Sequence, residues 1–182
     1  MHGIIHYELR RFVEHRYGGQ ETWDTLLTTA ELEDSFYLPN GVYPDEHIVK
    51  ILQAASTVTK KSIDTLQREF GEFIVPSLVK TYGAYIKREW NILDFLENIE
   101  GTIHTTVRRN NPGATPPELK IKRVSPDEVV IEYSSARRMF GVLHGILAGV
   151  IKHYQATVIV KELSTTPIYT LSVQQISLQG VV

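Results

Sequence analysis

The chain has 182 residues, of which 42% are hydrophobic and 22% are charged, with a formal net charge of −2. This composition is ordinary for a globular domain, the charge favours neither nucleic acid nor an anionic membrane as a partner, and the lack of cysteine excludes disulfides and thiolate chemistry. No apolar run is long enough to cross a bilayer, and the N-terminus lacks the apolar core of a signal peptide, so we expect a cytoplasmic protein.

The first half of the chain is predicted to be mostly helical. Gly18 and Gly19 are typical of the end of the first helix, because glycine favours the left-handed conformation there. Pro44 suits the first turn of the third helix, since its backbone is pre-set for that position. We expect the fourth helix to stop near Gly71. Apolar spacing places the helices at about residues 5–17, 23–30, 44–58, 62–70 and 76–83.

A further helix is predicted from Asn91, a good N-cap, to Asn110, where an Asn-Asn-Pro-Gly sequence stops it. His104 follows Leu93 by about three turns and therefore lies close to the apolar face of this helix. The imidazole is either an ordinary core histidine bonded to a carbonyl or a single axial ligand of haem iron. None of the seven histidines has a zinc-binding spacing. The apolar stripe consists of Leu93, Leu96, Ile99, Ile103 and Val107.

The composition changes after Pro117, where β-branched runs alternate with one apolar helix. We predict strands at 119–124, 128–134, 156–160 and 169–178, and a helix at 138–155. This order indicates an α+β fold with an N-terminal helical lobe and a C-terminal lobe of four antiparallel strands and packed helices. The expected lobes of the single domain cover about 1–62 and about 63–182.

Tyr133, Ser135 and Arg137 follow the predicted strand at every second position. If the strand continues through Arg137, the three side chains point the same way, because side chains alternate across a strand. Two hydroxyls and a guanidinium then form a cradle suited to a carboxylate or phosphate. The alternative is an ordinary polar strand face in contact with water. With His104, the group offers the polar contacts that haem requires, namely one imidazole and donors for two carboxylates.

These residues lead to a family resemblance that covers nearly the whole chain. The sequence resembles the haem nitric oxide/oxygen-binding (H-NOX) family, which also forms the haem sensor of soluble guanylate cyclase. The combination of Tyr-x-Ser-x-Arg with an upstream histidine and an intervening proline is highly specific. The matching positions are Met1, Gly3, Ile5, Trp23, Ala54, Ala55, Ser56, Phe70, Gly71, His104, Gly113, Ala114, Thr115, Pro116, Pro117, Tyr133, Ser135 and Arg137.

The resemblance implies that haem b binds between the two lobes. His104 matches the proximal iron ligand, and Tyr133, Ser135 and Arg137 match the clamp for the haem propionates. Pro117 matches a residue that distorts the macrocycle.

Ile5 matches a second residue that distorts the haem. Asp45 matches an acid near the clamp arginine, which suggests an ion pair between Asp45 and Arg137. Simpler explanations are core packing for Ile5 and a strand-entry role for Pro117.

The resemblance also predicts which gas binds. Oxygen-binding members use a distal tyrosine as a hydrogen-bond donor, and Val142 occupies that position here. Leu9 and Ile74 occupy the positions that support the tyrosine. Because these three residues offer no donor, NO and, more weakly, CO should be favoured over O2. Tyr7, Tyr82 or Tyr85 would have to supply a donor from elsewhere, which the family match gives no reason to expect.

The expected function is sensing by a stand-alone bacterial NO sensor, with no catalytic residues. NO binding weakens the iron–histidine bond, which relaxes the haem distortion and lets the lobes shift. The chain carries no output segment, so the effector is either a partner in trans or a further part of a longer chain. The family suggests a histidine kinase of two-component signalling or a diguanylate cyclase of cyclic-di-GMP signalling.

Two other functions remain open. A haem enzyme acting on NO or peroxide would need distal acid–base groups, which Leu9, Ile74 and Val142 do not supply. A haem-free interaction module would keep His104 in its core and use Arg137 to bind an acid of its partner.

Overall fold

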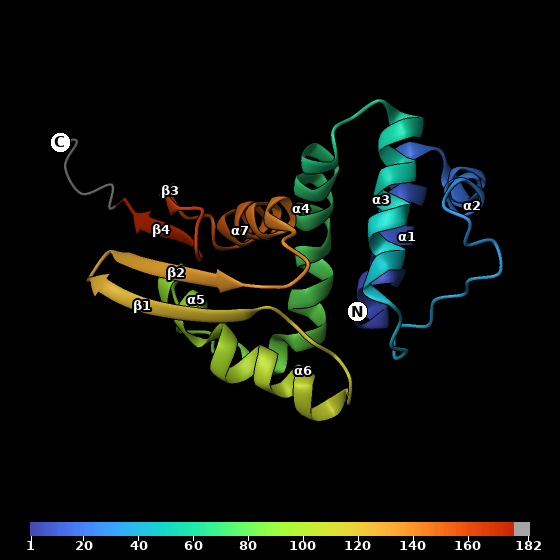
Figure 1. Ribbon diagram of the computed structural model, residues 1–182. Helices are drawn as coiled ribbons and strands as arrows, with labels where there is room; N and C mark the ends of the chain where they lie inside the picture. Colours follow the sequence, from blue (N-terminus) through green and yellow to red (C-terminus); the bar gives the residue numbers. More distant parts are fainter. Residues whose placement is uncertain (177–182) are drawn as a thin grey trace. The chain divides into compact units, whose positions relative to one another are not determined.

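The computed structural model describes residues 1–176 and has an α+β fold (Figure 1). The helices are α1 (Gly3–Tyr17), α2 (Gly19–Thr29), α3 (Asp45–Thr59), α4 (Ile63–Tyr82), α5 (Ile92–Ile99), α6 (Thr105–Asn110) and α7 (Phe140–Tyr154), with a 3₁₀ turn at Gly83–Tyr85 and a π-helical turn at Glu100–His104. The strands are β1 (Glu118–Ser125), β2 (Glu128–Ser134), β3 (Val158–Ser164) and β4 (Tyr169–Gln175). The α+β class and the four-stranded antiparallel sheet are confirmed.

The chain folds into two compact units. The first consists of Met1–Val75, Asn110–Thr115 and Met139–Gly149. The second consists of Pro76–Arg109, Pro116–Arg138 and the chain from Val150 onward. The expected division of the chain into lobes near residue 62 stays a prediction.

The helices of the first unit surround an apolar core. α1 packs against α2, and α2 packs against α3 (Figure 1). α1 ends at Tyr17 and is capped by Gly18, whose φ of 114° lies in the left-handed region, as the Gly-Gly sequence predicts. α3 begins at Asp45 directly after Pro44. The most deeply buried large side chains of this unit are Leu9, Phe12, Leu26, Ile48, Ile51, Leu66, Phe70 and Ile74.

The predicted stop of the fourth helix near Gly71 is wrong, because α4 continues to Tyr82. Gly71 allows close packing instead: a Cβ there would lie 2.5 Å from the Val142 carbonyl oxygen and 2.9 Å from the Gly145 Cα. A glycine at the contact lets the backbones of α4 and α7 approach each other. Pro76 also lies inside α4 and does not end it. Tertiary packing therefore explains a glycine that resembles a helix stop in the sequence.

Gly145→Ala is expected to destabilise the fold. A Cβ at position 145 would lie 2.1 Å from the carbonyl oxygen of Arg68, a backbone atom that cannot rotate away. Overpacking of this kind costs about 1–3 kcal/mol of unfolding free energy, or more when the backbone must move. The measurement is urea unfolding. Gly83→Ala is the control, because a Cβ there would meet no atom within 4 Å; equal midpoints for the two variants would contradict the close contact.

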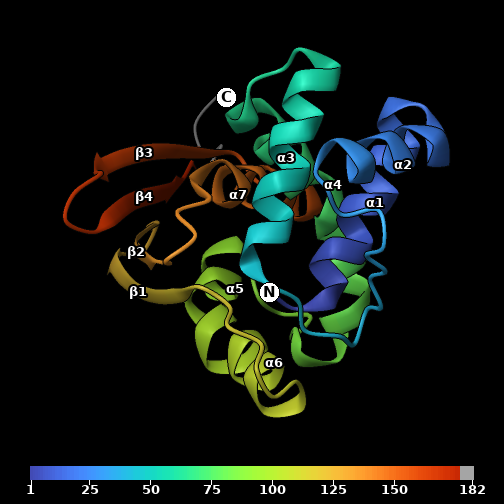
Figure 2. The same ribbon diagram turned by 45° about the vertical axis from the view of Figure 1, so that its right-hand side comes forward.

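The sheet of the second unit has the strand order β1-β2-β4-β3. Figure 2 shows its two hairpins, β1–β2 in yellow to orange and β3–β4 in red. Alternate residues of β2 are buried, as the period of two predicts, whereas in β4 Ser172 is buried together with its neighbours Leu171 and Val173. α5 contacts β1 and β2. The third strand begins at Val158, later than predicted, and of the fourth predicted strand Ser177 and Leu178 lie outside the described residues. The buried sheet residues include Val129, Ile131, Tyr133, Tyr169, Leu171 and Val173.

His6 is a fully buried histidine in the first unit. Its ring stacks on Tyr37 with centroids 4.6 Å apart and meets the edge of Tyr43. Neither ring nitrogen makes a hydrogen bond of normal geometry to residues 1–176. Burial lowers the pKa of His6 from 6.5 to about 4, and the positive N-terminus and His47 act in the same direction, while Asp45 opposes them. The ring is therefore neutral at neutral pH.

His6→Phe is expected to reduce the loss of stability in mild acid. The unfolded chain binds a proton near pH 6.5, whereas the folded chain does so only near pH 4, so unfolding becomes easier as pH falls between these values. A shift of this size corresponds to roughly 3 kcal/mol. The test is the unfolding free energy from pH 7 to 4.5, with the exposed His153→Gln as control. An unchanged acid slope in the His6 variant would disprove this explanation.

Candidate functional site

His104 lies on a π-helical turn, which the sequence did not predict. Asn91 caps α5 as predicted, with its side chain accepting from the backbone of Asp94 in a capping box. The helix then widens over Glu100–His104 before α6 begins at Thr105. The Thr105 hydroxyl and backbone N–H both donate to the Glu100 carbonyl. Single π-helical turns inside helices occur frequently at functional sites.

The imidazole of His104 is largely buried, with 15% of the side chain exposed. Its Nδ1 lies 2.8 Å from Oε2 of Glu100. Burial lowers the pKa of His104 and Arg108 acts in the same direction, while Glu100 and the backbone of Pro117 raise it. Because an ionised carboxylate can only accept, Nδ1 carries the proton in the neutral ring. The lone pair of Nε2 is then the one suited to binding a metal.

Glu100 is a site residue that the sequence reasoning missed. Besides His104, it accepts hydrogen bonds from Nη2 of Arg108, at 2.6 Å, and from the backbone N–H of Leu119, at 3.1 Å. Burial alone would raise the pKa of Glu100, but the hydrogen bonds from His104 and Arg108 outweigh it and lower the pKa. The carboxylate is therefore charged at neutral pH. Its position four residues before His104 was the available signal, because such pairs are neighbours on a helix.

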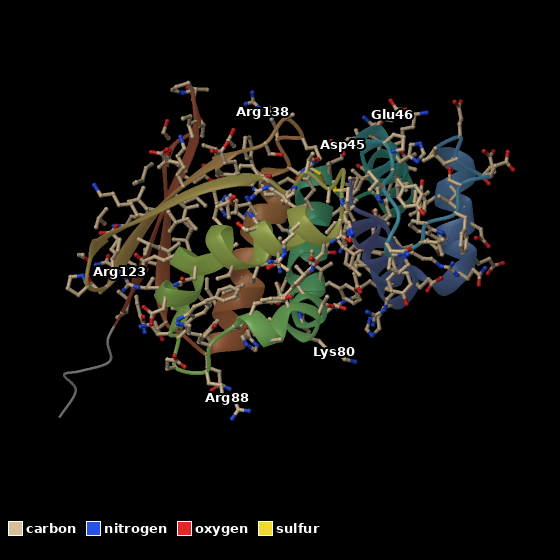
Figure 3. All side chains as sticks on the ribbon, turned by 90° about the horizontal axis from the view of Figure 1, so that it is seen from below. Asp45, Glu46, Lys80, Arg88, Arg123 and Arg138 are labelled. Carbon is tan, nitrogen blue, oxygen red and sulfur yellow. The ribbon has the colours of Figure 1, made fainter. Side chains whose placement is uncertain are left out.

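A second charged group fixes α5 to the sheet. Arg123, labelled in Figure 3, lies on β1 and donates to Glu97 and Asp94, each at 2.8 Å. One arginine thus bridges two acids of the helix that precedes His104. The start of β1 is also bonded to Glu100 through Leu119. The segment carrying His104 is consequently held against β1 at two places.

The structure brings Tyr133, Ser135 and Arg137 together at the end of β2. The expectation that the strand continues through Arg137 is wrong: β2 ends at Ser134, and Ser135 begins a turn in which its hydroxyl accepts from the backbone N–H of Arg137. Burial raises the pKa of Tyr133, while a hydrogen bond with Ser135 and the charge of Arg137 lower it, so the three groups are close. The cluster therefore arises from a strand end and a turn.

Exposure along this segment still alternates. Tyr133 is buried, and Ser135 and Arg137 are partly covered, whereas the residues between them are exposed. Arg138 has a positive φ of 50° and extends outward from the ribbon (Figure 3). Tyr133, Ser135 and Arg137 are therefore less exposed than the residues between them.

The predicted distal residues Leu9, Ile74 and Val142 belong to the first unit, as does Ile5, which is predicted to distort the haem. Leu9 on α1 and Ile74 on α4 are each 1% exposed. Ile5 on α1 and Val142 on α7 are partly covered. None of these four side chains carries a hydrogen-bond donor.

Two further predicted residues lie in different units. Pro117 directly precedes β1 in the second unit and is partly covered. Asp45 begins α3 in the first unit, where one carboxylate oxygen lies 2.6 Å from the N-terminal amine of Met1. The suggested ion pair between Asp45 and Arg137 stays a prediction.

The side chains of the second unit fit haem in their chemistry. His104 offers one imidazole whose Nδ1 is already bonded, which leaves Nε2 for an iron, and Tyr133, Ser135 and Arg137 offer donors for carboxylates. Within residues 1–176, no group of three or more His, Cys, Asp or Glu side chains could hold a metal ion. Among these residues His104 therefore belongs to no multi-residue metal site of this kind. None of the helices in this range is long and apolar enough to cross a membrane.

Sequence comparison finds relatives over most of the chain. The profile of the family described as Haem-NO-binding matches residues 2–162. Soluble guanylate cyclase 89Da of Drosophila melanogaster is 23% identical over 145 residues, which cover 75% of this chain and 20% of that protein. The chain thus spans about a fifth of the length of this curated relative.

Solved structures with the same fold include several H-NOX proteins. The Fe(II)NO form of an H-NOX protein from S. oneidensis matches with a TM-score of 0.89 and 20% identity, covering 97% of this chain and 100% of that chain. The unliganded Fe(II) form of the A71G mutant of an H-NOX protein from K. algicida matches with a TM-score of 0.86 and 25% sequence identity, covering 98% of each chain. The oxygen complex of an oxygen-binding H-NOX domain related to soluble guanylate cyclases matches with a TM-score of 0.83 and 22% sequence identity, covering 97% of this chain and 96% of that chain. The family fold therefore occurs in proteins described with NO and with O2.

Proposed function

The chain belongs to the haem-NO-binding family, and from that premise we propose that it is a haem b sensor that binds NO, binds CO more weakly and excludes O2. H-NOX domains of this family are haem-binding gas sensors. The finer proposal concerns the residues that hold the haem, the gas that is selected and the output. The absence of hydrogen-bond donors at Leu9, Ile74 and Val142 is the observation that carries it.

We assign His104 as the iron ligand, binding through Nε2. When bound, haem supplies an iron centre that takes a diatomic gas. Tyr133, Ser135 and Arg137 would donate to its carboxylates, because two hydroxyls and a planar guanidinium match those acceptors. Their grouping beside the end of β2 supports this assignment.

Gas selection would follow from the apolar side chains. O2 bound to ferrous haem gains negative charge and is stabilised by a hydrogen-bond donor, whereas NO gains little from one. Leu9, Ile74 and Val142 can exclude water but cannot donate a hydrogen bond. Without a hydrogen-bond donor near the bound gas, the affinity for O2 should therefore be low relative to the affinities for NO and CO. It also argues against a haem enzyme acting on peroxide or NO, which would use a distal acid or base.

The output would be a change in conformation rather than a chemical product. A gas shifts a conformational equilibrium only if it binds the two states with different affinity. Pro117 and Ile5 are the residues through which we expect the bound haem to be distorted, so a change at His104 would reach the fold through them. We propose a cytoplasmic histidine kinase or diguanylate cyclase as the partner in trans.

Haem content tests the proposal against a haem-free interaction module. The protein is purified from cells supplied with a haem precursor, and haem is quantified as the pyridine complex. We expect one haem b per chain, held without a covalent link. A colourless protein that also fails to take up added haem would contradict the proposal and return His104 to the role of a core residue.

A further inference from the structure

Glu100 is hydrogen-bonded directly to the proposed iron ligand. One of its carboxylate oxygens accepts from Nδ1 of His104 at 2.8 Å and from the backbone N–H of Leu119 at 3.1 Å. The other accepts from Arg108 at 2.6 Å. We propose that Glu100 is a positioning residue that orients His104, increases its electron donation to iron and thereby strengthens the iron–histidine bond against release by NO. This inference rests on the proposed function, because it takes His104 to be the ligand.

The acceptor for Nδ1 of His104 is a carboxylate. A metal-bound histidine usually donates its second ring N–H to a carboxylate, a carbonyl or water, and the partner sets the ring orientation and the basicity of the ligand. A charged carboxylate draws the proton more strongly than a neutral carbonyl does, so the imidazole gains anionic character. The short contact from Nδ1 of His104 to Oε2 of Glu100 provides such a partner. The remaining nitrogen, Nε2, then becomes a stronger donor to iron.

The carboxylate of Glu100 is itself held in place. Arg108 lies on α6 and Leu119 on β1, so Glu100 is bonded from two elements besides its own turn. An exposed carboxylate four residues before a histidine would change rotamer freely and contribute little. Glu100 is only 27% exposed and has a bonded partner on both oxygens. Its direction toward His104 is therefore fixed before any ligand binds.

Glu100 is also connected to the proposed clamp for the haem carboxylates. Leu119, whose N–H donates to Glu100, is the register partner of Tyr133 across the β1–β2 pair. His104 and Tyr133 are thus connected through one side chain and one strand pair, all within the second unit. The π-helical turn lies between α5 and α6 at the point where this connection starts. A loosened Glu100 contact would free the imidazole from β1.

The test compares three variants of the haem-loaded chain. Glu100→Ala removes the acceptor, and Glu100→Gln keeps an acceptor oxygen without the charge. Glu97→Gln is the matched control, because Glu97 accepts from Arg123 and not from His104, and Asp94 keeps α5 bonded to Arg123 when Glu97 is altered. The main readout is the iron–histidine stretching frequency of the ferrous protein, measured by resonance Raman spectroscopy. A second readout is the midpoint potential of the iron, and a third is the rate of haem loss.

We expect the stretching frequency to fall in Glu100→Gln and to fall further in Glu100→Ala, with the midpoint potential rising in the same order. Haem loss should be about 10- to 100-fold faster in the alanine variant, the range typical for an outer-shell partner. In the Glu100→Ala variant, a larger fraction of the NO complex should be five-coordinate than in the unaltered protein. Glu97→Gln should match the unaltered protein in all of these.

Two results separate the possible failures. If both Glu100 variants bind haem through His104 with an unchanged frequency and potential, Glu100 is merely structural and the inference is wrong, while the proposed function stands. A chain that takes up no haem, recognised by the missing Soret band, overturns the inference together with the proposed function. Exchange of the His104 Nδ1 proton in the diamagnetic CO complex adds a direct check: it should accelerate in Glu100→Ala, and an unchanged rate would exclude the hydrogen bond.

Discussion

Val142→Tyr is expected to give the ferrous protein measurable affinity for O2 in air. The new hydroxyl would donate a hydrogen bond to the partly negative bound gas, and such a bond to a charged acceptor is worth about 1.5–3 kcal/mol. At 1.4 kcal/mol for each factor of ten, O2 affinity should rise by roughly 10- to 100-fold. NO affinity should change far less. The measurement is an O2 titration of the ferrous protein, followed by its absorption spectrum.

Val142→Phe is the matched control for this substitution. It introduces a ring of nearly the same size without a hydroxyl, so it reports the effect of bulk alone. Val142 lies on α7 and is partly covered, and its own carbonyl oxygen lies close to Gly71. The phenylalanine and tyrosine rings would therefore have the same neighbours. An equal gain in O2 affinity for both variants, or no gain in either, would contradict the donor argument.

His104→Gly is expected to abolish haem retention during purification. The side chain supplies the one imidazole that we assign to the iron. Losing it should weaken haem binding by more than the roughly 10- to 100-fold typical of an outer-shell partner. Added imidazole should restore haem binding, because the small molecule can occupy the space left by the side chain. Haem content after gel filtration, with and without imidazole, provides the measurement.

His153→Ala is the control for the histidine substitution. His153 is exposed in the last turn of α7 and should not affect haem. Full haem retention in His104→Gly without imidazole would show that another residue binds the iron. It would also remove the basis for the role assigned to Glu100.

Part of the candidate site could be predicted from the sequence, because the hydrogen-bond donors of a side chain are known from its residue type alone. The two-residue spacing of Tyr133, Ser135 and Arg137 predicted a carboxylate cradle, and the structure groups these side chains even though β2 ends at Ser134. Turn geometry set by the Ser135 hydroxyl replaces the predicted strand pairing. The prediction held for the grouping of these residues and failed for the local backbone.

The remaining features depend on contacts between distant segments. Gly71 resembles a helix stop in the sequence, yet the approach of α7 explains why glycine is required inside α4. The π-helical turn before His104 has no periodic signature, because one widened turn shifts the apolar pattern only locally. The backbone N–H of Leu119 on β1 donates to the Glu100 carboxylate, 19 residues earlier in the chain, and a local sequence pattern does not predict such a contact. Such contacts require the tertiary structure.

The absorption spectrum of the ferrous protein, recorded first in air and then with NO, tests the central claim most directly. We predict a five-coordinate haem spectrum that forms no stable complex with O2 and changes on adding NO. The same spectrum reports whether His104 remains bound in the NO form. A stable O2 complex in air would contradict the donor-free description of Leu9, Ile74 and Val142 and would show that a hydrogen-bond donor reaches the gas.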